Sequence, residues 1–395
     1  MFKRLVKCGA AFAVCAACVP LAACAQDRTV YGKNYYAMGT EATYLVAAKT
    51  EKETFDDLAA RVGDFLAATE RSVSATVAQS YVAKFNAAEA GATVEIDQTS
   101  YSLFTLAKQI YADTDGYFNP AVWYCEDLFG FAYGISSVDL REKMPYDREG
   151  ALDGFGTLPD EKYVTAFCEL ASHFGEVVLT EEEGRYYAVK PDFTVKVEGD
   201  DNEYSLRVDF GGIAKGWCAD RVNEMMDEAG ISYGYFNFGM SSMSLKKYAY
   251  NDTGDYTVSS GDPRNSGADY VTRSVQDTAL STSGDNMQYF VVDGVRYCHI
   301  IDPTTGAPIR TGVASVTVYG GSAAEADALT TALAAMGKQK AVEYINEKTT
   351  DQKVVMLVFE DGAGKIITNC PQDIEIHNKN YVVINTVVDG KIVLN

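Results

Sequence analysis

Two kinds of hydrophobic periodicity, helical and strand-like, are mixed along this chain without a regular repeat. From about Glu51 to Arg71 the apolar residues recur at helical spacing, whereas Ala42–Ala47 alternates as a strand does. The spacing predicts further helices over 99–116, 160–173, 215–230 and 322–348, the last with a break at 337, and strands over 177–179, 186–189, 206–208, 313–319, 354–359 and 381–385. Because neither a strand–helix–strand rhythm nor a G-x-G-x-x-G or Walker loop is present, we expect an α+β or mixed α/β fold.

The charge of the chain limits its ligands. Of its 395 residues, 47% are hydrophobic, which is typical of a globular protein with a core. The formal net charge is −21. Proteins that bind nucleic acid need a basic surface to displace counterions from phosphates, so we expect no nucleic-acid partner. A phosphate-bearing ligand must be met by local groups or by a metal ion, because the overall field repels anions.

The first 24 residues are predicted to be a leader and not part of the fold. A basic start is followed by an apolar stretch over 8–23, which is too short to span a bilayer comfortably. The stretch ends in Leu21-Ala22-Ala23-Cys24, which resembles a bacterial lipobox. In this interpretation a lipid on Cys24 anchors the chain to the membrane outside the cytoplasm, and 25–34 is a tether. The alternative is an ordinary secretory peptide cut at Ala23 or Ala25.

Five cysteines follow the leader. They are widely spaced and odd in number, and no C-x-x-C pair is among them. Neither a zinc site nor a disulfide framework is therefore indicated, and we expect single buried thiols.

The segment from Val208 to Gly216 carries the strongest local signal. Its sequence, Val-Asp-Phe-Gly-Gly-Ile-Ala-Lys-Gly, predicts a strand that ends at Asp209, two glycines, and an immediate helix start. Backbone N–H groups at such a helix N-terminus, with Lys215 as a point charge, suit a phosphate group. The same pattern also fits a tight strand-to-helix turn with a solvated lysine.

A second signal lies on the predicted helix over 322–348. Asp327 and Thr331 are four residues apart, so both side chains face the same way. A carboxylate and a hydroxyl on one face suit Mg²⁺, which prefers oxygen ligands and usually keeps waters and substrate oxygens. The alternative is an acidic residue near a helix start, favoured by the helix dipole, above a buried threonine.

The remaining signals are turns that carry polar groups. His299 is one of three histidines and ends a predicted strand before Asp302-Pro303, where it can donate to a phosphate oxygen or sit as a satisfied strand-edge histidine. Three further turns are the segments 37–41 (Ala-Met-Gly-Thr-Glu), 115–120 (Asp-Gly-Tyr-Phe-Asn-Pro) and 280–285 (Leu-Ser-Thr-Ser-Gly-Asp). Read singly, each is ordinary turn chemistry.

Taken together and in this order, the segments closely resemble the ApbE family of FAD:protein FMN transferases. The family pattern runs Met-Gly-Thr, a Ser-rich segment, Gly-x-Phe-Asp-Pro, Asp-Leu-Gly-Gly-Ile-Ala-Lys-Gly, Thr-Ser-Gly, His-Ile-Ile-Asp-Pro-x-Thr-Gly and Asp-Ala-Leu-x-Thr-Ala-Leu. The resemblance covers roughly Tyr35 to Lys348. It implies one α+β, T-fold-like domain over 35–395, with helices packed on a central mixed or antiparallel sheet and a possible insertion at 244–273.

The resemblance also implies roles for individual residues. Asp209, Lys215 and His299 are the catalytic candidates and contact FAD. Asp327 and Thr331, with the Gly212 carbonyl, are the Mg²⁺ ligands. The residues expected to line the FAD site besides these are Met38, Phe118, Asn119, Pro120, Thr282, Ser283 and Gly284.

This chain departs from the family pattern at several positions. Asn119 stands where the family has an aspartate, and Thr76 stands where an aromatic residue often stacks on the ligand. The usual Asn-x-Gly-Gly-Asn/Asp reads Asn237-Phe-Gly-Met-Ser241. These changes bear on flavin affinity and on the choice of acceptor.

The activity that the resemblance implies is Mg²⁺-dependent transfer of FMN from FAD to a Ser/Thr hydroxyl of an acceptor protein, with release of AMP. Two alternatives use the same residues differently. An FAD pyrophosphatase would use water as the nucleophile and give AMP and FMN. A non-catalytic lipoprotein would bind FAD without needing the metal ligands Asp327 and Thr331.

Overall fold

A nine-stranded sheet forms the centre of the molecule. The computed structural model describes residues 30–47, 49–132, 158–349 and 351–395. The strands, in spatial order, are β1 (Val30–Ala37), β2 (Thr40–Ala47), β8 (Gly234–Phe238), β9 (Ser242–Leu245), β12 (Thr278–Gly284), β17 (Val313–Tyr319), β18 (Lys353–Glu360), β19 (Ala363–Thr368) and β21 (Val382–Val383). All neighbours pair antiparallel except β19 and β21, which are parallel.

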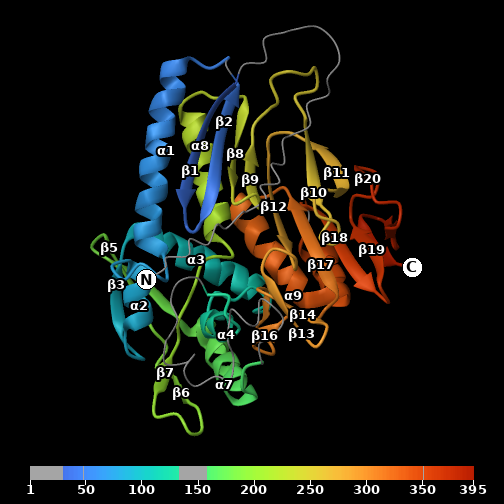
Figure 1. Cartoon of the computed structure of the whole chain (residues 1–395). Coiled ribbons are helices and arrows are strands. Elements are labelled where there is room, and N and C mark those ends of the chain that lie inside the picture. Colours follow the sequence, from blue (N-terminus) through green and yellow to red (C-terminus); the bar gives the residue numbers. More distant parts are fainter. Residues whose placement is uncertain (1–29, 48, 133–157, 350) are drawn as a thin grey trace, which may run out of the picture.

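Three long helices cover one face of this sheet: α1 (Lys52–Val73), α8 (Ala214–Glu228) and α9 (Ala323–Lys348) (Figure 1). Helix α1 buries the apolar residues that its spacing predicts, among them Leu58 and Val62, in one cluster with Phe236 of β8. Helix α9 packs on β17 and β18, where alternate residues such as Val354 and Met356 point toward it.

The opposite face of the sheet is covered by a three-stranded sheet of β10 (Tyr256–Gly261), β11 (Asp269–Val275) and β20 (Ile374–Ile376). The side chains that alternate with the helix-facing ones, such as Val355 and Leu357, pack here with Tyr270 and Val271. The segment 244–273, predicted as a possible insertion, therefore forms part of β9, β10 and most of β11, and its apolar side chains help to cover the sheet.

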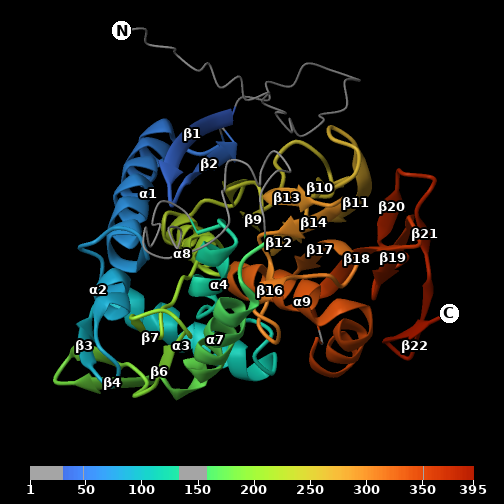
Figure 2. The same cartoon turned by 60° about the horizontal axis from the view of Figure 1, so that its bottom comes forward.

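A second group of elements packs at one end of the sheet around its own apolar cluster (Figure 2). Its helices are α2 (Tyr81–Ala87), α3 (Gln98–Asp113), α4 (Trp123–Leu128), α7 (Glu161–Ser172) and the 3-10 helix η1 (His173–Glu176). Its strands are β3 (Thr93–Ile96), β4 (Val178–Glu182), β5 (Arg185–Val189), β6 (Thr194–Lys196) and β7 (Glu203–Ser205). Strands β6 and β7 pair with each other. Three further two-stranded pairs are β13 (Tyr289–Val292) with β14 (Val295–Cys298), β15 (Ile301–Asp302) with β16 (Ala307–Pro308), and β22 (Asn385–Val388) with β23 (Lys391–Leu394).

Most of the predicted elements are confirmed. The helices over 51–71, 99–116, 160–173, 215–230 and 322–348 are present within a few residues, and Gly337 interrupts α9 with φ 70° and ψ 178°. The expected α+β fold on a mixed, largely antiparallel sheet is confirmed as well. The thiols of Cys125, Cys168, Cys218, Cys298 and Cys370 are unpaired, as predicted, and all but Cys168 are buried.

Two predictions of elements were wrong, and one strand is present but ends a residue earlier than predicted. The stretch 206–208 forms no strand, because Asn86 bonds both backbone groups of Val208 with its side chain and leaves none for a ladder. The strand before His299 ends at Cys298. The strand expected over 381–385 is limited to β21, and Asn385 begins β22. The stretch between 359 and 381, where no strand was predicted, contains β19 and β20.

Within the described ranges no helix is both long enough and apolar enough to cross a membrane. The leader, with Cys24, and residues 25–29 of the predicted tether lie outside the described residues. The rest of that prediction was wrong, because 30–34 belong to strand β1 and pair with β2.

Candidate active site

The predicted phosphate-binding segment reaches its place through side-chain and loop hydrogen bonds. The amide and carbonyl of Val208 bond the side chain of Asn86 at 2.8 Å each, and the N–H of Asp209 donates to the Pro120 carbonyl at 2.8 Å. The chain then turns at Gly211-Gly212 into helix α8, and the Asp209 carboxylate accepts the Gly211 N–H. The backbone N–H groups at the start of α8 therefore lie near the Asp209 carboxylate and, at Gly216, near the Asp327 carboxylate of α9. Such N–H groups suit an anion, and the carboxylates suit a cation bound beside it.

The N-termini of α8 and α9 approach each other at Gly216. A Cβ on Gly216 would lie 2.1 Å from the Ala323 carbonyl oxygen and 2.7 Å from the Ala324 Cα, so only glycine allows this contact. Across it, the Asp220 carboxylate accepts the N–H groups of Ala323 and Ala324 at 2.7 and 2.9 Å, which caps the start of α9 from the neighbouring helix.

Asp327 is buried at this helix junction, with 3% of its surface exposed. Its two carboxylate oxygens accept hydrogen bonds from the Gly216 N–H and the Ser281 hydroxyl, each at 3.1 Å. The Lys215 ammonium lies 3.9 Å from the same carboxylate. A buried charge requires such partners, and the Asp327 carboxylate has them from α8 and β12.

Thr331, one turn after Asp327, lies beside Gly212. The Thr331 hydroxyl oxygen is 3.8 Å from the point where a Cβ on Gly212 would stand, and Phe118 Cε2 is 3.5 Å from that point. The structure therefore brings together the three residues that the sequence assigned to Mg²⁺, although Gly212 is more than a hundred residues from the other two. The sequence spacing predicted only the Asp327–Thr331 half of this arrangement.

These donors fit a small hard cation. One carboxylate, one hydroxyl and a neighbouring backbone carbonyl are oxygen donors, and Mg²⁺ usually takes few protein ligands and keeps water and phosphate oxygens. Among the described residues there is no group of three or more His, Cys, Asp or Glu side chains that could hold a metal ion. An ion at Asp327 would therefore depend on the hydroxyl, the carbonyl and oxygens from outside the protein to complete its shell.

His299 presents an unpaired ring nitrogen. Its Nδ1 is buried and, among the described residues, has no hydrogen-bond partner, while Phe131 meets the ring edge-on at 6.5 Å between centroids. Burial lowers the pKa of His299 to about 4, and the nearby Lys215 ammonium acts in the same direction. The imidazole is therefore neutral at pH 7 and offers one donor and one acceptor but no charge. A buried polar atom without a partner is the kind of group that a ligand satisfies.

Glu126 on α4 is a site residue that the sequence did not reveal. Burial and, to a smaller extent, the neighbouring Asp209 carboxylate raise the pKa of Glu126 to about 8, although Lys215 opposes both. Burial also raises the pKa of Asp209, against the Gly211 hydrogen bond and the Lys215 charge. Two half-buried carboxylates that share one environment do not both ionise easily, so these surroundings favour one proton on the pair. No motif marks Glu126, because its proximity to Asp209 arises only from the packing of α4.

Of the other residues predicted for the FAD site, Phe118 lies next to the proposed metal ligand Gly212, whereas Asn119 makes internal hydrogen bonds. Met38 holds a turn with φ 49° between β1 and β2 and donates its N–H to Glu70, and Phe118 lies next to Gly212. Asn119 uses its amide internally, donating to the Ala171 carbonyl at 3.0 Å and accepting the Ala121 N–H at 2.9 Å. Asn119 therefore holds the segment that ends in Pro120 and directs no side-chain group into the site.

Strand β12 divides its three predicted site residues between two faces. The Ser283 hydroxyl bonds Thr330 of α9 at 2.8 Å, on the face of β12 where Ser281 bonds Asp327. The Thr282 hydroxyl bonds Thr317 at 3.0 Å, on the opposite face, so its side chain points away from Asp327. Gly284 ends the strand, where a Cβ would lie 2.7 Å from the Asn286 side chain.

The arrangement as a whole joins helix N-termini, a lysine, oxygen donors for a hard cation, a neutral histidine and a pair of carboxylates that share a proton. This combination is suited to an enzyme that binds a phosphate-bearing ligand, stabilises charge on it and moves a proton. The fold and the site thus define a class of phosphoryl-transfer or phosphate-cleaving enzymes.

Comparison with known proteins identifies the family. The model of the ApbE family matches residues 38–356, and the chain belongs to the ApbE family. A protein of Treponema pallidum named FAD:protein FMN transferase is 28% identical over 325 residues, which are 80% of this chain and 82% of that protein. A protein of the same name from Vibrio cholerae is 40% identical over 166 residues, 40% of this chain and 47% of that protein.

Solved structures agree in fold. The flavin transferase ApbE from Vibrio cholerae superposes with a TM-score of 0.66 at 23% identity, over 86% of this chain and 97% of its own. The ApbE protein from Thermotoga maritima superposes with a TM-score of 0.67 at 26% identity, over 84% of this chain and 94% of its own. The α+β arrangement on one long sheet is therefore that of the ApbE structures.

Proposed function

We propose that this protein transfers the FMN half of FAD to a serine or threonine hydroxyl of an acceptor protein, with AMP as the leaving group. Membership of the ApbE family and relatives named FAD:protein FMN transferase support this activity. The observation that carries the proposal is Asp327, whose nearly buried carboxylate lies 3.9 Å from the Lys215 ammonium, one helical turn before Thr331.

We propose Mg²⁺ as the metal, held by the Asp327 carboxylate, the Thr331 hydroxyl and the Gly212 carbonyl. The ion would neutralise charge on the pyrophosphate of FAD as the phosphorus–oxygen bond breaks. Lys215 supplies a second positive charge next to the same carboxylate, which otherwise would repel the substrate phosphates. The N–H groups at the start of α8 add donors without a net charge.

In this proposal the acceptor hydroxyl oxygen forms a bond to the phosphorus on the FMN side. The bond from that phosphorus to the bridging oxygen breaks, and AMP leaves with the electron pair. The hydroxyl proton passes to Asp209, the candidate base, whose pKa is raised by its surroundings. Glu126 next to it keeps a proton more readily, because its pKa is raised to about 8. The neutral His299 can donate a hydrogen bond to a phosphate oxygen or a flavin carbonyl.

The test uses the chain after Ala23 with FAD, Mg²⁺ and acceptor peptides that hold a Ser or Thr, each with an alanine-substituted partner peptide. Covalent flavin on the peptide is followed by in-gel fluorescence and mass, and AMP by chromatography. Asp327→Asn should lower the rate at least about a hundredfold, because it removes the metal's charged ligand while keeping the side-chain shape. Asp227→Asn, at an exposed carboxylate of α8 that pairs with Lys246, is the matched control.

The outcomes separate the three functions. Labelled peptide with wild type and Asp227→Asn, but not with Asp327→Asn, supports the transferase. If AMP forms at the same rate but no peptide is labelled, the protein is an FAD hydrolase and not a transferase. If FAD binds but no AMP forms, the protein only binds FAD.

We propose also that the protein is anchored outside the cytoplasm by a lipid on Cys24. The apolar stretch over 8–23 and the Leu-Ala-Ala-Cys ending support this location. Bacteria that express the full chain with a radiolabelled fatty acid should incorporate label, and Cys24→Ala should not. Equal label in both would contradict the anchor and favour the ordinary secretory peptide.

A further inference from the structure

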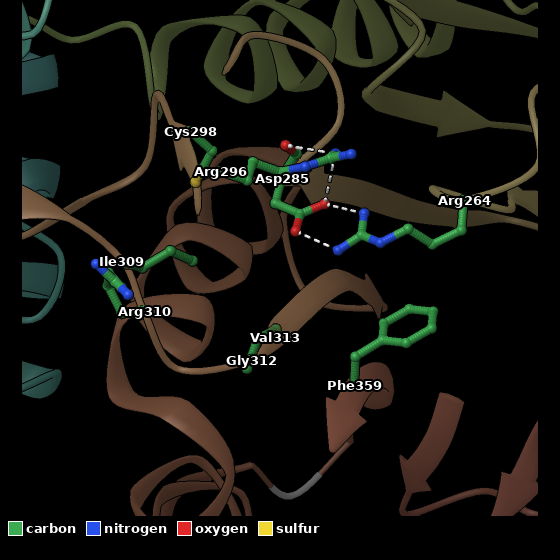
Figure 3. A pocket seen from close by; sticks show the side chains of 9 residues that line it. All are labelled: Arg264, Asp285, Arg296, Cys298, Ile309, Arg310, Gly312, Val313 and Phe359. Carbon is green, nitrogen blue, oxygen red and sulfur yellow. Dashed lines mark hydrogen bonds and ion pairs between the residues drawn. The ribbon is translucent and has the colours of Figure 1, made fainter. Parts of the chain in front are cut away.

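A cavity of about 170 Å³ has none of the residues predicted to bind FAD or metal in its lining, although Asp285 in that lining follows the predicted site residue Gly284. Its lining is made of Arg264, Asp285, Arg296, Cys298, Ile309, Arg310, Gly312, Val313 and Phe359 (Figure 3). None of these residues belongs to the site around Asp327, although Cys298 directly precedes His299. The volume is an order of magnitude above the roughly 15 Å³ that a single water needs, so a small polyatomic ligand fits.

Two arginines from separate segments meet at Asp285. Arg264, in the connection between β10 and β11, binds the carboxylate with both terminal nitrogens at 2.6 Å. Arg296, on β14, donates to the Asp285 carbonyl at 3.3 Å and lies 3.6 Å from the carboxylate. Figure 3 shows both guanidinium groups converging on Asp285 from different parts of the ribbon.

The positive charge in the lining exceeds the negative charge. Three arginines stand against the single carboxylate of Asp285, which leaves an excess of two positive charges in a chain whose net charge is −21. Arg310 makes no ion pair with any described residue, and its one polar partner is the Tyr297 hydroxyl at 3.5 Å. Asp262, the nearest other carboxylate along the chain from Arg264, accepts from Asn378 and Tyr381.

The guanidinium groups also retain unused donors in fixed positions. An arginine has five N–H donors, and Arg296 spends one in a hydrogen bond, to the Asp285 carbonyl. Each arginine lies over an aromatic ring: Arg264 over Phe359 at 4.8 Å, Arg296 over Tyr289 at 3.9 Å, and Arg310 over Tyr297 at 5.7 Å. Such stacking orients the planar groups before a ligand arrives, which lowers the entropy lost on binding.

We propose that this cavity is a second anion site, which takes the phosphate or carboxylate group of a small ligand through Arg264 and Arg296. The apolar side chains of Ile309, Val313 and Phe359 form the rest of the lining and strengthen the attraction by excluding water. An oxyanion can use the donors that Asp285 leaves free, because planar guanidinium groups match phosphate and carboxylate geometry. This site does not depend on the proposed transfer reaction.

The test is binding of inorganic phosphate to the chain after Ala23, followed by ³¹P line broadening, with saturating FAD and with magnesium withheld. In the proposed function FAD fills the phosphate positions near Lys215, so phosphate that still binds would do so elsewhere. Arg296→Gln should weaken phosphate binding at least about tenfold, since hydrogen bonds to charged groups are the strong ones. Arg221→Gln, at an exposed arginine of α8, should leave it unchanged.

A second variant works in the opposite direction and guards against a folding defect. Asp285→Asn keeps the side-chain shape but removes the competing carboxylate, so phosphate should bind several-fold more tightly. Titration with AMP and with acetate then identifies the source of the group: tighter AMP binding indicates a nucleotide, equal binding of phosphate and acetate a free anion.

The proposal is overturned if phosphate does not bind in the presence of FAD. It is overturned also if Lys215→Gln abolishes binding while Arg296→Gln does not, or if Asp285→Asn leaves the affinity unchanged. The arginines would then serve only to fasten the β10–β11 connection to β14.

Discussion

At the scale of single residues, His299 shows how strongly burial sets the chemistry of this site. Its pKa is lowered to about 4, so the folded protein keeps the imidazole neutral over a range in which an unfolded chain protonates it. Between pH 6.5 and pH 4 the unfolded state binds more protons than the folded state. The free energy of unfolding must therefore fall as the pH drops through this range.

We predict that His299→Gln removes this dependence. The stability of the variant relative to wild type should rise by about 2 kcal/mol between pH 7 and pH 4.5, because glutamine cannot take up the proton. Urea denaturation at the two pH values measures the difference. His377→Gln, at an exposed histidine bonded to Thr272, is the control, and an equal rise there would show that burial of His299 is not the cause.

Single residues also show where prediction from sequence stops. Asp327 and Thr331 were paired correctly, because the helical period alone puts residues four apart on one face. Glu126 was not found, because nothing in its local sequence shows that α4 brings it to Asp209. The side chains of Thr282 and Asn119 were expected in the site, but both are used for internal hydrogen bonds.

At the scale of elements, the junction of α8 with α9 decides the geometry of the site. The two helix starts touch at Gly216, and three carboxylate hydrogen bonds cross the contact, two to Asp220 and one to Asp327. The junction depends on the absence of a single Cβ, because the atoms that a Cβ would meet belong to backbone and cannot rotate away.

We predict that Gly216→Ala lowers the free energy of unfolding by about 1–3 kcal/mol, as overpacking does in other cores. Activity should fall as well, because the Gly216 N–H is a partner of Asp327. Denaturant unfolding and the flavin-transfer assay measure the two effects. Gly261→Ala, where a Cβ would meet nothing within 4 Å, is the control. If the two variants were equally stable, the contact at Gly216 would have to be looser than the structure shows.

Elements were predicted well where apolar periodicity is long. Helices α1 and α9 and strand β17 match their predicted spans closely, since each carries a long run of buried apolar residues. The short stretch 206–208 has strand-like residues but forms no ladder. The Val208 backbone bonds the Asn86 side chain, and the N–H of the next residue, Asp209, donates to the Pro120 carbonyl. Local propensity cannot anticipate such a partner, which lies far away in the sequence.

At the scale of the whole molecule, substrate and metal should stabilise the fold together. Asp327 lies on α9 and is bonded by groups of α8 and β12, so a ligand that binds there contacts one strand of the sheet and two of the helices that cover it. A ligand that binds only the folded state raises the free energy of unfolding by about 2.7 kcal/mol at a hundred times its Kd.

We predict that FAD with Mg²⁺ raises the Tm by several degrees, and that removal of Mg²⁺ by a chelator reverses most of the rise. Because the overall charge is −21, FAD without the cation should bind more weakly. Differential scanning fluorimetry of wild type and Asp327→Asn measures this. An equal rise with and without Mg²⁺ in wild type would contradict a metal at Asp327.

The class of fold, the long helices and strands, the family, and the placement of Asp327 and Thr331 on one helix face could all be predicted from the sequence. Each of these depends on local periodicity or on motif order, which are properties of neighbouring residues. Three contacts could not be predicted in this way and are seen only in the folded chain: Gly212 beside Thr331, Glu126 in the surroundings of Asp209, and Arg264 with Arg296 at Asp285. These contacts join distant segments, and they follow from how the whole core packs rather than from any one segment.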